Sequence, residues 1–317
     1  MKIVQLESLR VSEEKMKELK TPFEQMGHVI EVYERSSAQE QIGQAREADV
    51  IIIGNMPLKR DVLSECKNLK MIDVGFTGTD HVDLEYAKEQ GITVCNAAGY
   101  STSTVAELVL GEAICLLRHV GKNQEACRGG QAAFPKLGKE LNAQTVGIVG
   151  FGAIGSKTAE LFHLMGARVL AYMPRPKRKP DYVKTVTLKE LMEQSDLVSL
   201  HCPLNDSTRE MIGKEELSWM KPTAVLINAA RGAVVDTAAL AEALENGAIA
   251  GAAIDVYENE PPLDQNHPLL HTPNTLVTPH IAFASEQSMV RRAEIVYENL
   301  RAWLEGNPQN VRVEGRW

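Results

Sequence analysis

The sequence predicts an α/β protein with two domains, each built on a parallel sheet that is covered by helices on both faces. The chain has 317 residues, more than one simple core usually holds. Short apolar runs alternate with helix-like stretches from one end of the chain to the other. Apolar strands that alternate with helices are typical of parallel sheets buried on both faces.

The expected elements can be placed in order along the chain. Strands are expected at Lys2–Leu6, Val50–Ile53, Met71–Val74, Thr93–Cys95, Thr145–Val149, Arg168–Tyr172, Leu197–Leu200, Ala224–Ile227, Gly251–Asp255 and Thr275–Val277. Helices are expected between them, among others at Val105–Leu117, Ser156–Met165, Leu188–Gln194, Thr237–Asn246 and Ser285–Glu305. Domain boundaries are expected near Asn96–Thr104, which is rich in Gly, Ser and Thr, and near Ala282–Ser285, just before the last long helix.

Composition and charge narrow the class of protein. The net charge is −8, from 34 basic and 42 acidic residues, which argues against a general nucleic-acid-binding surface. No apolar run is long enough to cross a bilayer, and the N-terminus turns charged too early for a signal peptide. The cysteines show no CxxC and no zinc-finger spacing: they are Cys66, Cys95, Cys115, Cys127 and Cys202. We therefore expect a cytoplasmic protein with reduced thiols, no metal site, and neither nucleic acid nor membrane as a partner.

A glycine-rich turn follows the strand expected at Thr145–Val149. The motif GFGAIG places Gly150, Gly152 and Gly155 between that strand and a helix. In a dinucleotide-binding turn the first glycine permits the tight turn, the second lets the pyrophosphate approach the backbone, and the third allows close helix–strand packing. The helix N-terminus then offers N–H groups to phosphate. Because strand and helix flank the motif in the required order, we interpret it as a dinucleotide-binding turn rather than an ordinary one.

The next expected strand, Arg168–Tyr172, lacks the acidic residue that usually binds the adenosine ribose at its end. Met173 stands at that position, and a basic run follows, made of Arg175, Lys177, Arg178 and Lys179. Basic side chains there suit a ribose 2′-phosphate, so we expect NADP(H) in preference to NAD(H). The alternative is that the basic run is only a solvated loop.

Polar residues follow the later strands of the same expected sheet, at the carboxyl ends where open α/β sheets bind ligands. They are His201, Cys202 and Pro203, then Asn228 and Arg231, then Asp255, Glu258 and Glu260, and finally His280. Their joint position favours one shared site. Each alone also has a structural explanation: Arg231 could pair with an acid, Asp255 could cap a turn, and His201 could pack beside the cofactor.

The chemistry of this set suits hydride transfer to a ketone beside a nicotinamide. The Arg231 guanidinium can bind a carboxylate through two parallel hydrogen bonds. A histidine paired with a carboxylate has its protonated form stabilised, so it can act as a general acid near neutral pH. We therefore expect arginine to hold the substrate, histidine to protonate the developing alkoxide, and glutamate to orient the histidine. The alanines beside Arg231, Ala229 and Ala230, would leave room for the nicotinamide.

Five motifs follow one another along the chain: GFGAIG, LHCPLN, INAARGAVVDTAALAEAL, AAIDVYENEPP and TPHIAFAS. As a set, from about Met71 to Ser285, they resemble the D-isomer-specific 2-hydroxyacid dehydrogenases. The resemblance implies a discontinuous, flavodoxin-like substrate domain of residues 1–99 and 284–317 and a Rossmann-type cofactor domain of residues 100–283. It also implies NAD(P)-dependent interconversion of a small 2-keto acid and its D-2-hydroxy acid, and a homodimer joined largely through cofactor-domain elements.

The resemblance also implies roles for individual residues. Arg231 matches the substrate-binding arginine, Glu260 the acid paired with histidine, and His280 the catalytic acid/base. Asp255 matches the aspartate that helps to place the nicotinamide, and Ile154 and Gly155 match the pyrophosphate turn. The other expected cofactor contacts are Thr104, Gly150, Gly152, Ala153, Met173, Arg175, Lys177, Cys202, Pro203, Ala229, Ala230 and His280.

Two stretches resemble the glycerate dehydrogenase/hydroxypyruvate reductase branch of the family: TGTDHVDLEYAKEQGITVCNAAGYSTSTVAE and HIAFAS, although Phe283 stands where a tryptophan is common. At Phe76, Thr77 and Gly78 the turn can present backbone N–H groups to a carboxylate, so we expect these residues to bind substrate. Hydroxypyruvate or glyoxylate is the expected substrate. The alternatives are a nucleotide-sensing, corepressor-like binding protein on the same fold and a family member acting on formate or phosphite.

Overall fold

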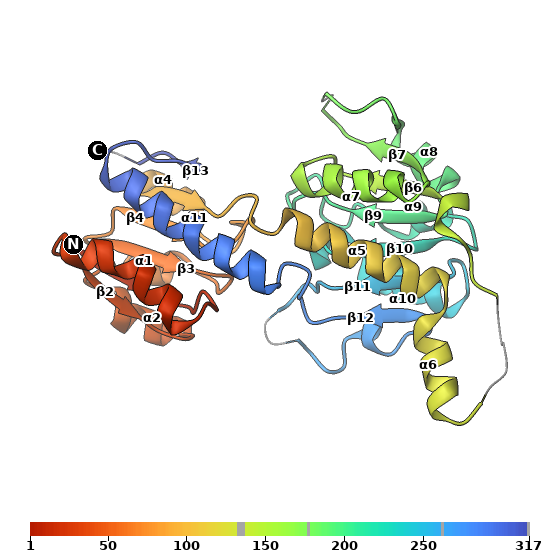
Figure 1. Ribbon diagram of the computed structural model, residues 1–317, viewed down its shortest axis with the longest axis horizontal. Helices are drawn as coiled ribbons and strands as arrows, with labels where there is room; N and C mark the ends of the chain where they lie inside the picture. The colour runs from red at the N-terminus through yellow and green to blue at the C-terminus, as the bar shows by residue number, and fades with distance from the viewer. Residues whose placement is uncertain (132–136, 176–177, 261–262, 316–317) are drawn as a thin grey trace. The chain divides into compact units, whose positions relative to one another are not determined.

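The computed structural model describes residues 1–131, 137–175, 178–260 and 263–315. The chain divides into two compact units, most of whose elements are labelled in Figure 1. Unit 1 consists of Met1–Ser101 and Ala284–Trp317, and unit 2 consists of Thr102–Phe283. The first segment of unit 1 thus ends at Ser101 rather than at residue 99. Two largely parallel sheets with helices between their strands confirm the expected fold class.

Unit 1 contains a six-stranded sheet in the order β13-β5-β4-β3-β1-β2. Its parallel strands have the 2-1-3-4-5 order of flavodoxin-like folds, and β13 pairs with β5 in the antiparallel direction. The apolar pattern does not predict β2 and β13, because both are partly exposed edge strands without a continuous buried run. The strands are β1 (Lys2–Gln5), β2 (Val29–Val32), β3 (Val50–Ile53), β4 (Met71–Val74), β5 (Thr93–Asn96) and β13 (Val311–Val313).

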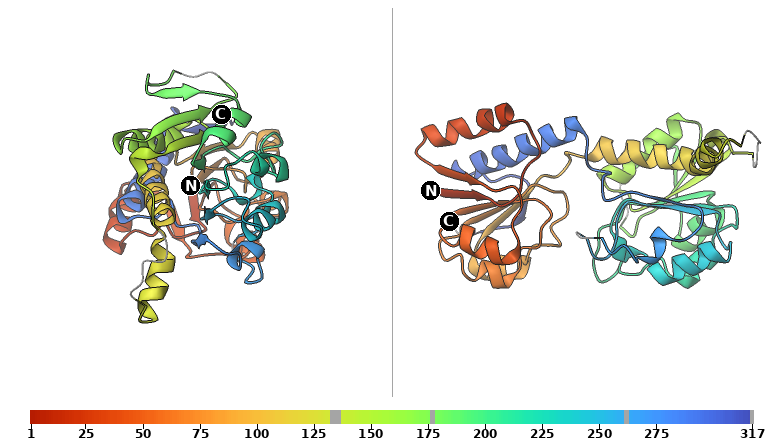
Figure 2. Two further views of the ribbon diagram at one scale, coloured as in Figure 1. Left: turned by 90° about the vertical axis from the view of Figure 1, so that its right-hand side faces the viewer. Right: turned by 90° about the horizontal axis from the view of Figure 1, so that it is seen from below.

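Helices cover both faces of the unit 1 sheet (Figure 2). One face carries α1 (Glu13–Gln25) and α11 (Glu286–Leu304), and the other carries α2 (Ala38–Ala45), α3 (Arg60–Leu63) and α4 (Leu84–Gln90). Serine side chains fix the starts of the two long helices. The Ser12 hydroxyl accepts a hydrogen bond from the Lys15 N–H at 3.2 Å, and the Ser285 hydroxyl accepts one from the Ser288 N–H at 3.1 Å.

Unit 2 contains a seven-stranded parallel sheet in the order β12-β11-β10-β9-β6-β7-β8. Counted from β6, this is the 3-2-1-4-5-6 order of Rossmann-type folds with one further strand at the edge. The order reverses between β6 and β9, so the carboxyl ends of these two strands mark the ligand-binding crevice of such a sheet. The strands are β6 (Thr145–Val149), β7 (Arg168–Tyr172), β8 (Val183–Thr185), β9 (Leu197–Leu200), β10 (Val225–Asn228), β11 (Gly251–Ile254) and β12 (Thr275–Val277).

Two apolar clusters hold the helices of unit 2 on its sheet. One cluster joins the sheet to α5 (Thr102–Leu117) and α7 (Ala153–Leu164). The other joins it to α8 (Leu188–Gln194), α9 (Lys214–Ser218) and α10 (Thr237–Glu245). Short 3-10 turns occur at Leu141–Ala143, Gly232–Val234 and Pro268–Leu270.

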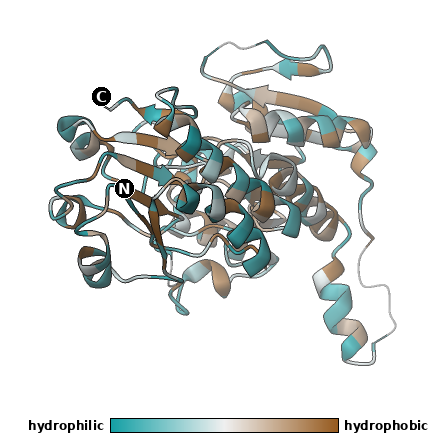
Figure 3. Cartoon of the chain, turned by 60° about the vertical axis from the view of Figure 1, so that its left-hand side comes forward, coloured by the Kyte–Doolittle hydropathy of each residue, from teal (hydrophilic) through white to brown (hydrophobic). Residues whose placement is uncertain are grey.

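A further helix, α6 (Val120–Arg128), follows α5 but buries none of its residues, and Figure 1 shows it extending away from the rest of unit 2. Figure 3 shows that apolar residues concentrate on the strands of both sheets, whereas the outer helices carry polar and apolar residues. Within the described ranges, no helix combines the length and apolar character that crossing a membrane requires.

Candidate active site

The glycine motif forms the turn between β6 and α7, at the carboxyl edge of the unit 2 sheet. Gly150 has a φ of +95°, in the left-handed region, and a Cβ there would lie 2.7 Å from the carbonyl oxygen of His201. A Cβ on Gly155 would lie 2.1 Å from the carbonyl oxygen of Gly150, whereas a Cβ on Gly152 would meet no atom within 4 Å. Gly150 and Gly155 are therefore required by packing. Gly152 faces open space, which suits the approach of a pyrophosphate to the backbone.

The helix α7 begins directly after this turn, at Ala153. Its N-cap is Gly152, so no side chain hydrogen-bonds to the N–H groups of the first turn, which includes Ile154. Uncapped N–H groups and the positive end of the helix dipole favour an anion at this position. The turn therefore fits the pyrophosphate of a dinucleotide.

The end of β7 differs from the usual ribose-binding arrangement. Met173 follows the strand and packs half-buried against the apolar cluster of α5 and α7, so an uncharged side chain stands where an acid usually binds the ribose. Arg175 and Arg178 are exposed, whereas the Lys179 ammonium donates to the carbonyl oxygen of Val183. Lys177, the other expected contact in this run, lies outside the described residues.

The segment after β9 passes directly over the glycine turn, where the backbone of His201 and Cys202 approaches Gly150. The His201 ring lies 2.9 Å from the Ser199 hydroxyl, and burial lowers the pKa of His201 to about 4. A neutral, hydrogen-bonded imidazole suits packing rather than acid catalysis. Burial also raises the pKa of the Cys202 thiol to about 11, which keeps it protonated and unreactive. Pro203, the next residue, continues this segment.

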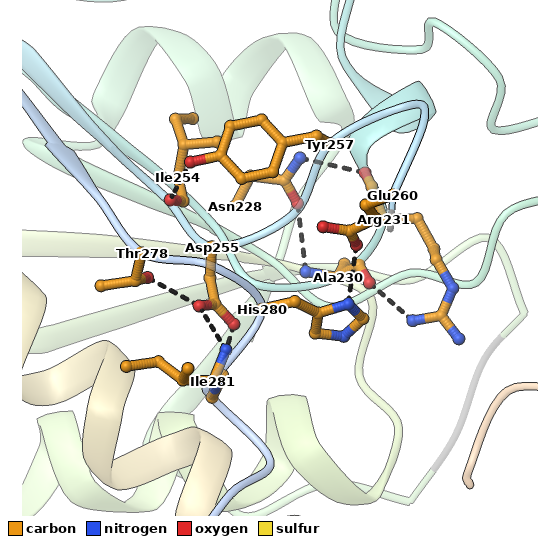
Figure 4. Close-up of polar contacts among 11 residues, drawn as sticks. Asn228, Ala230, Arg231, Ile254, Asp255, Tyr257, Glu260, Thr278, His280 and Ile281 are labelled. Atoms are coloured by element: carbon orange, nitrogen blue, oxygen red, sulfur yellow. Dashed lines mark hydrogen bonds and ion pairs between the residues drawn. The ribbon is translucent and has the colours of Figure 1, made fainter. Parts of the chain in front are cut away.

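The loop after β10 is held by the side chain of Asn228. Its amide oxygen accepts from the Ala230 N–H at 3.1 Å, and its amide nitrogen donates to the Arg231 carbonyl oxygen at 3.0 Å (Figure 4). Arg231 is half-buried and donates from Nη1 to the Ala230 carbonyl oxygen at 2.8 Å, with Ala229 half-buried beside them. Asn228 thus fixes the loop that carries the arginine, a role that its position at a strand end does not reveal.

Gly232 allows this loop to pack against the segment that follows β11. A Cβ on Gly232 would lie only 2.1 Å from the carbonyl carbon of Tyr257. The close approach, rather than a special turn conformation, is what requires glycine here.

The side chains of His280 and Glu260 pair at this edge. The His280 Nδ1 lies 2.6 Å from a Glu260 carboxylate oxygen, and the two side chains are 19% and 17% exposed (Figure 4). His280 has a φ of +52°, and its N–H donates to the Asp255 carbonyl oxygen at 2.7 Å. The Phe283 ring meets the imidazole edge-on, with centroids 5.5 Å apart. The imidazole is therefore fixed through its backbone, through Nδ1 and through one ring contact.

Asp255 organises the turn that carries His280. Its buried carboxylate accepts hydrogen bonds from the Thr278 hydroxyl at 2.6 Å and from the N–H groups of Ile281 and Ala282, each at 2.8 Å (Figure 4). Burial raises the pKa of Asp255, and these hydrogen bonds oppose that rise. Asp255 therefore caps and stabilises a turn, which is one of the two explanations that its position in the sequence allows.

A second buried carboxyl group, Glu112 on α5, lies near Asp255. Glu112 is 2% exposed, and neither carboxyl oxygen has a hydrogen-bond partner among the described residues. Burial and then the negative charge of Asp255 raise the pKa of Glu112 to about 8. An acid within the apolar stretch VAELVLGEAICLL is the sequence signal that could have singled it out.

The expected carboxylate-binding turn lies in unit 1, after β4. Phe76 is 5% exposed, its N–H donates to the Val74 carbonyl oxygen at 2.7 Å, and its ring lies 6.1 Å from the Tyr100 ring. Phe76 therefore anchors the turn. Thr77 is exposed and Gly78 is half-buried, so these two residues are the better candidates for contact with an anion.

A chain of buried amides supports this turn from behind. The Asn96 amide donates to the Thr77 carbonyl oxygen at 2.6 Å. The Asn299 amide of α11 donates to the Asn96 carbonyl oxygen at 3.0 Å and to the Asp73 carboxyl group at 3.1 Å. Burial raises the pKa of Asp73 to about 8. The C-terminal helix thus helps to hold the turn in place.

The expected residues fall into two groups, one in each unit. Unit 2 brings Arg231, Glu260 and His280 to the carboxyl ends of β10, β11 and β12, which are neighbouring parallel strands. Thr104 lies half-buried in the first turn of α5. Unit 1 carries the turn at Phe76–Gly78. In the described parts of both units, no group of three or more His, Cys, Asp or Glu side chains is placed to hold a metal ion.

Comparison with known proteins agrees with these features. The protein-family model for the NAD-binding domain of D-isomer-specific 2-hydroxyacid dehydrogenases matches residues 110–282, more than half of the chain. The chain is 38% identical to the glycerate dehydrogenase of Methylorubrum extorquens, over 90% of this chain and 92% of that protein. It is 33% identical to the hydroxypyruvate reductase of Blautia hydrogenotrophica, over 91% of this chain and 92% of that protein. An acyclic imino acid reductase solved with NADPH and D-Arg superposes with a TM-score of 0.90 at 28% identity, covering 99% of this chain and 100% of that one.

The chain therefore belongs to the D-isomer-specific 2-hydroxyacid dehydrogenase family. It is an oxidoreductase of the class that uses a nicotinamide cofactor.

Proposed function

We propose that this dehydrogenase reduces a small 2-keto acid of the hydroxypyruvate or glyoxylate class to the D-2-hydroxy acid. The observation that carries the proposal is the Glu260–His280 pair at the sheet edge that also carries Arg231 (Figure 4). The relatives named glycerate dehydrogenase and hydroxypyruvate reductase support this choice of substrate.

In this proposal Arg231 binds the substrate carboxylate through two parallel hydrogen bonds and draws electron density from the neighbouring carbonyl group. A nicotinamide held at this edge would supply the hydride for the carbonyl carbon. His280 gives its proton to the carbonyl oxygen, where negative charge develops. Because Nδ1 faces Glu260, the proton leaves from Nε2. Glu260 keeps the ring oriented through its contact with Nδ1.

The cofactor-binding residues in this proposal line the carboxyl edge of the unit 2 sheet. The open position at Gly152 and the N–H groups of Ala153, Ile154 and Gly155 would hold the pyrophosphate, with Gly150 setting the turn. The remaining contacts would come from Thr104, Met173, Cys202, Pro203, Ala229, Ala230 and the turn organised by Asp255.

We also propose that NADP(H) is preferred over NAD(H). Two features support the preference: Met173 in place of an acid at the end of β7, and the exposed guanidinium of Arg175, with Lys177 in the same run. A carboxylate at this position would repel a 2′-phosphate, whereas a guanidinium attracts it.

We further propose a cytoplasmic homodimer joined through unit 2, with Phe76, Thr77 and Gly78 forming the substrate-facing turn of unit 1. The unburied helix α6, which begins at the exposed Val120, and the exposed apolar side chain of Leu137 support a partner surface on unit 2. The five cysteines are free thiols, which suits a reducing compartment.

Steady-state kinetics test the function. We expect the purified protein to oxidise NADPH faster than NADH in the presence of hydroxypyruvate or glyoxylate, and to reduce NADP⁺ with D-glycerate but not with L-glycerate. Formate and phosphite are included as oxidisable substrates. Turnover of formate or phosphite without turnover of any 2-keto acid would show that the substrate class is wrong.

Two histidine variants test the proposed acid. His280→Gln should lower kcat by roughly two to four orders of magnitude while NADPH still binds. His267→Gln is the matched control, because His267 also pairs with a carboxylate, that of Glu258 at 2.8 Å. Equal losses of kcat in both variants would remove His280 from its assigned role.

A further inference from the structure

Glu112 is a buried acid on α5 that has no partner among the described residues. Its side chain is 2% exposed, and neither carboxyl oxygen takes part in a hydrogen bond there. Val109 and Ala113 on the same helix belong to the apolar cluster of α5 and α7. A carboxyl group without hydrogen bonds in such surroundings costs stability, and such groups are uncommon in folded proteins. Glu112 is therefore a candidate for function rather than for structural support.

Glu112 packs over β11 near Asp255. The helix α5 lies across β10 and β11 of the unit 2 sheet (Figure 1). Leu116, one helical turn after Glu112, approaches Gly251: its Cδ2 lies 3.6 Å from the position that a Cβ on Gly251 would take. Because side chains alternate along a strand, Gly251, Ala253 and Asp255 share this face. The two small residues leave room for the longer side chain of Glu112.

The carboxyl groups of Glu112 and Asp255 are electrostatically coupled. Burial, and then the negative charge of Asp255, raise the pKa of Glu112 to about 8. The three hydrogen bonds that the Asp255 carboxylate accepts favour its ionised form. Two buried carboxyl groups near each other do not both ionise readily. Glu112 therefore holds a proton while Asp255 carries the negative charge.

Few other ionisable groups surround Glu112. The strands β10, β11 and β12 carry none. Tyr257, two residues after Asp255, is 4% exposed, and its pKa is raised to about 12 by burial and then by nearby carboxylates, Glu112 among them. Burial raises the pKa of Asp255, and the charge of His280 is among the factors that oppose this rise. The other ionisable residues of α5 and of the adjoining α7 are half-buried or exposed: Glu107, Cys115, Lys157, Glu160 and His163.

A positive charge beside Asp255 would counteract the effect of the Asp255 carboxylate on Glu112. The nicotinamide ring carries a positive charge in NAD(P)⁺ and none in NAD(P)H. We propose that Glu112 distinguishes these two forms of the cofactor: it releases its proton to solvent when NAD(P)⁺ binds and keeps its proton when NAD(P)H binds. The assignment rests on the proposed function, which puts the nicotinamide at the turn organised by Asp255.

Proton release makes the affinity for the oxidised cofactor depend on pH. In the protein without cofactor the pKa of Glu112 is about 8, and a bound positive charge lowers it. Between these two pKa values the binding of NADP⁺ releases a proton, so its Kd falls as the pH rises, by up to about tenfold per pH unit. Outside this window Glu112 has the same protonation state before and after binding, and its effect on the pH dependence ends.

Isothermal titration calorimetry with NADP⁺ and with NADPH, at pH 6, 7 and 8, tests the assignment. Each titration is run in two buffers of different ionisation enthalpy, which gives the number of protons released as well as the Kd. NAD⁺ and NADH replace this pair if they bind more tightly. The cofactor 2′-phosphate also titrates in this range, but both forms carry it, so the NADPH titration subtracts its contribution.

Two variants remove the ionisable group: Glu112→Gln keeps a polar side chain, and Glu112→Leu fills the same space without one. Each serves alone if the other does not fold. Asp73→Asn is the control, because it removes from unit 1 a buried acid whose pKa burial also raises to about 8. His280 is present in all of these proteins, so its own titration is common to them.

We expect the Kd of NADP⁺ to fall from pH 6 to pH 8 by at least about threefold more in the wild-type protein than in either Glu112 variant. The wild-type protein should also release more protons on binding NADP⁺ at pH 7 than these variants do. Asp73→Asn should behave like the wild-type protein. The Kd of NADPH should have the same pH dependence in all four proteins.

Equal proton release on NADP⁺ binding by the wild-type protein and both Glu112 variants would overturn the assignment. A change of the same size for NADP⁺ and NADPH would also overturn it, since Glu112 would then act on the fold and not on the charge of the cofactor. In both cases the cofactor still binds, so the proposed function would survive. If the wild-type protein binds no nicotinamide cofactor, the proposed function fails, and the assignment of Glu112 fails with it.

Discussion

Replacing Glu112 by glutamine should make the stability of unit 2 less dependent on pH. In the folded protein the pKa of Glu112 is raised from its ordinary value of 4.5 to about 8, first by burial and then by the charge of Asp255. Between these values the folded chain keeps a proton that the unfolded chain has released. The folded state therefore loses stability as pH rises through this window. Glutamine has the same shape but cannot ionise, so the variant lacks this loss.

The magnitude follows from the linkage of proton binding to folding. One proton held only by the folded state changes the free energy of unfolding by about 1.4 kcal/mol per pH unit. From pH 5.5 to pH 7.5, Glu112 alone should therefore lower the stability of the wild-type protein by about 3 kcal/mol relative to Glu112→Gln. The difference in the free energy of unfolding between the two proteins should increase steadily as the pH rises.

Urea unfolding followed by circular dichroism at pH 5.5, 6.5 and 7.5 measures this difference in the free energy of unfolding. Asp73→Asn is the matched comparison, because burial also raises the pKa of Asp73 to about 8, but in unit 1. If the two units unfold in separate steps, each variant should change the pH dependence of only its own step. Parallel pH dependences for the wild-type protein and Glu112→Gln would refute the reasoning, since they would mean that Glu112 is ionised in the folded protein.

Three further predictions concern the substrate arginine, the glycines and the basic run. Arg231→Lys should lower kcat/KM by about two orders of magnitude, because lysine cannot form two parallel hydrogen bonds to a carboxylate. The affinity for NADPH, measured by fluorescence titration, should not change. A loss of cofactor affinity alone would contradict the role of Arg231. Gly232→Ala should lower the melting temperature, because its Cβ would fall 2.1 Å from the backbone, whereas Gly152→Ala should melt normally and bind NADPH more weakly. Equal melting temperatures for the two variants would show that Gly232 is not required by packing more than Gly152 is. Replacing Arg175 and Lys177 by alanine should raise KM for NADPH but not for NADH, and an unchanged ratio would indicate a solvated loop.

The sequence predicts the central strands well, because each is a short apolar run buried on both faces. The pattern does not predict three edge strands, β2, β8 and β13, although it predicts the edge strand β12. Val29–Val32 is half-exposed and contains Glu31, and Val311–Val313 pairs on one side only, so neither has the composition of a buried strand. Their positions depend on neighbours far away in the sequence, which no local pattern contains.

The candidate site also contains residues that the sequence indicates and supporting residues that it does not. The positions of Arg231, Glu260 and His280 after apolar strands place them in a candidate set, and the resemblance to the dehydrogenase family is what selects them from it. The residues that hold them are harder to select. Asn228 supports Arg231 through two side-chain hydrogen bonds to backbone, and Thr278 supports the His280 turn through Asp255. Such roles are defined by geometry, and asparagine or threonine at a strand end is ordinary in composition.

The discontinuity of unit 1 has a consequence for the order in which the chain folds during its synthesis. When Met1–Ser101 leaves the ribosome, it lacks α11, which covers one face of its sheet and supplies Asn299, and it lacks β13, which pairs with β5. Until Ala284–Trp317 is made, β5 is an uncovered sheet edge of the kind that promotes aggregation. Unit 2 is continuous and can complete its core first. We therefore expect unit 2 to fold before unit 1. Although Met1–Ser101 is synthesised first, it completes its fold only after Ala284–Trp317 has been synthesised.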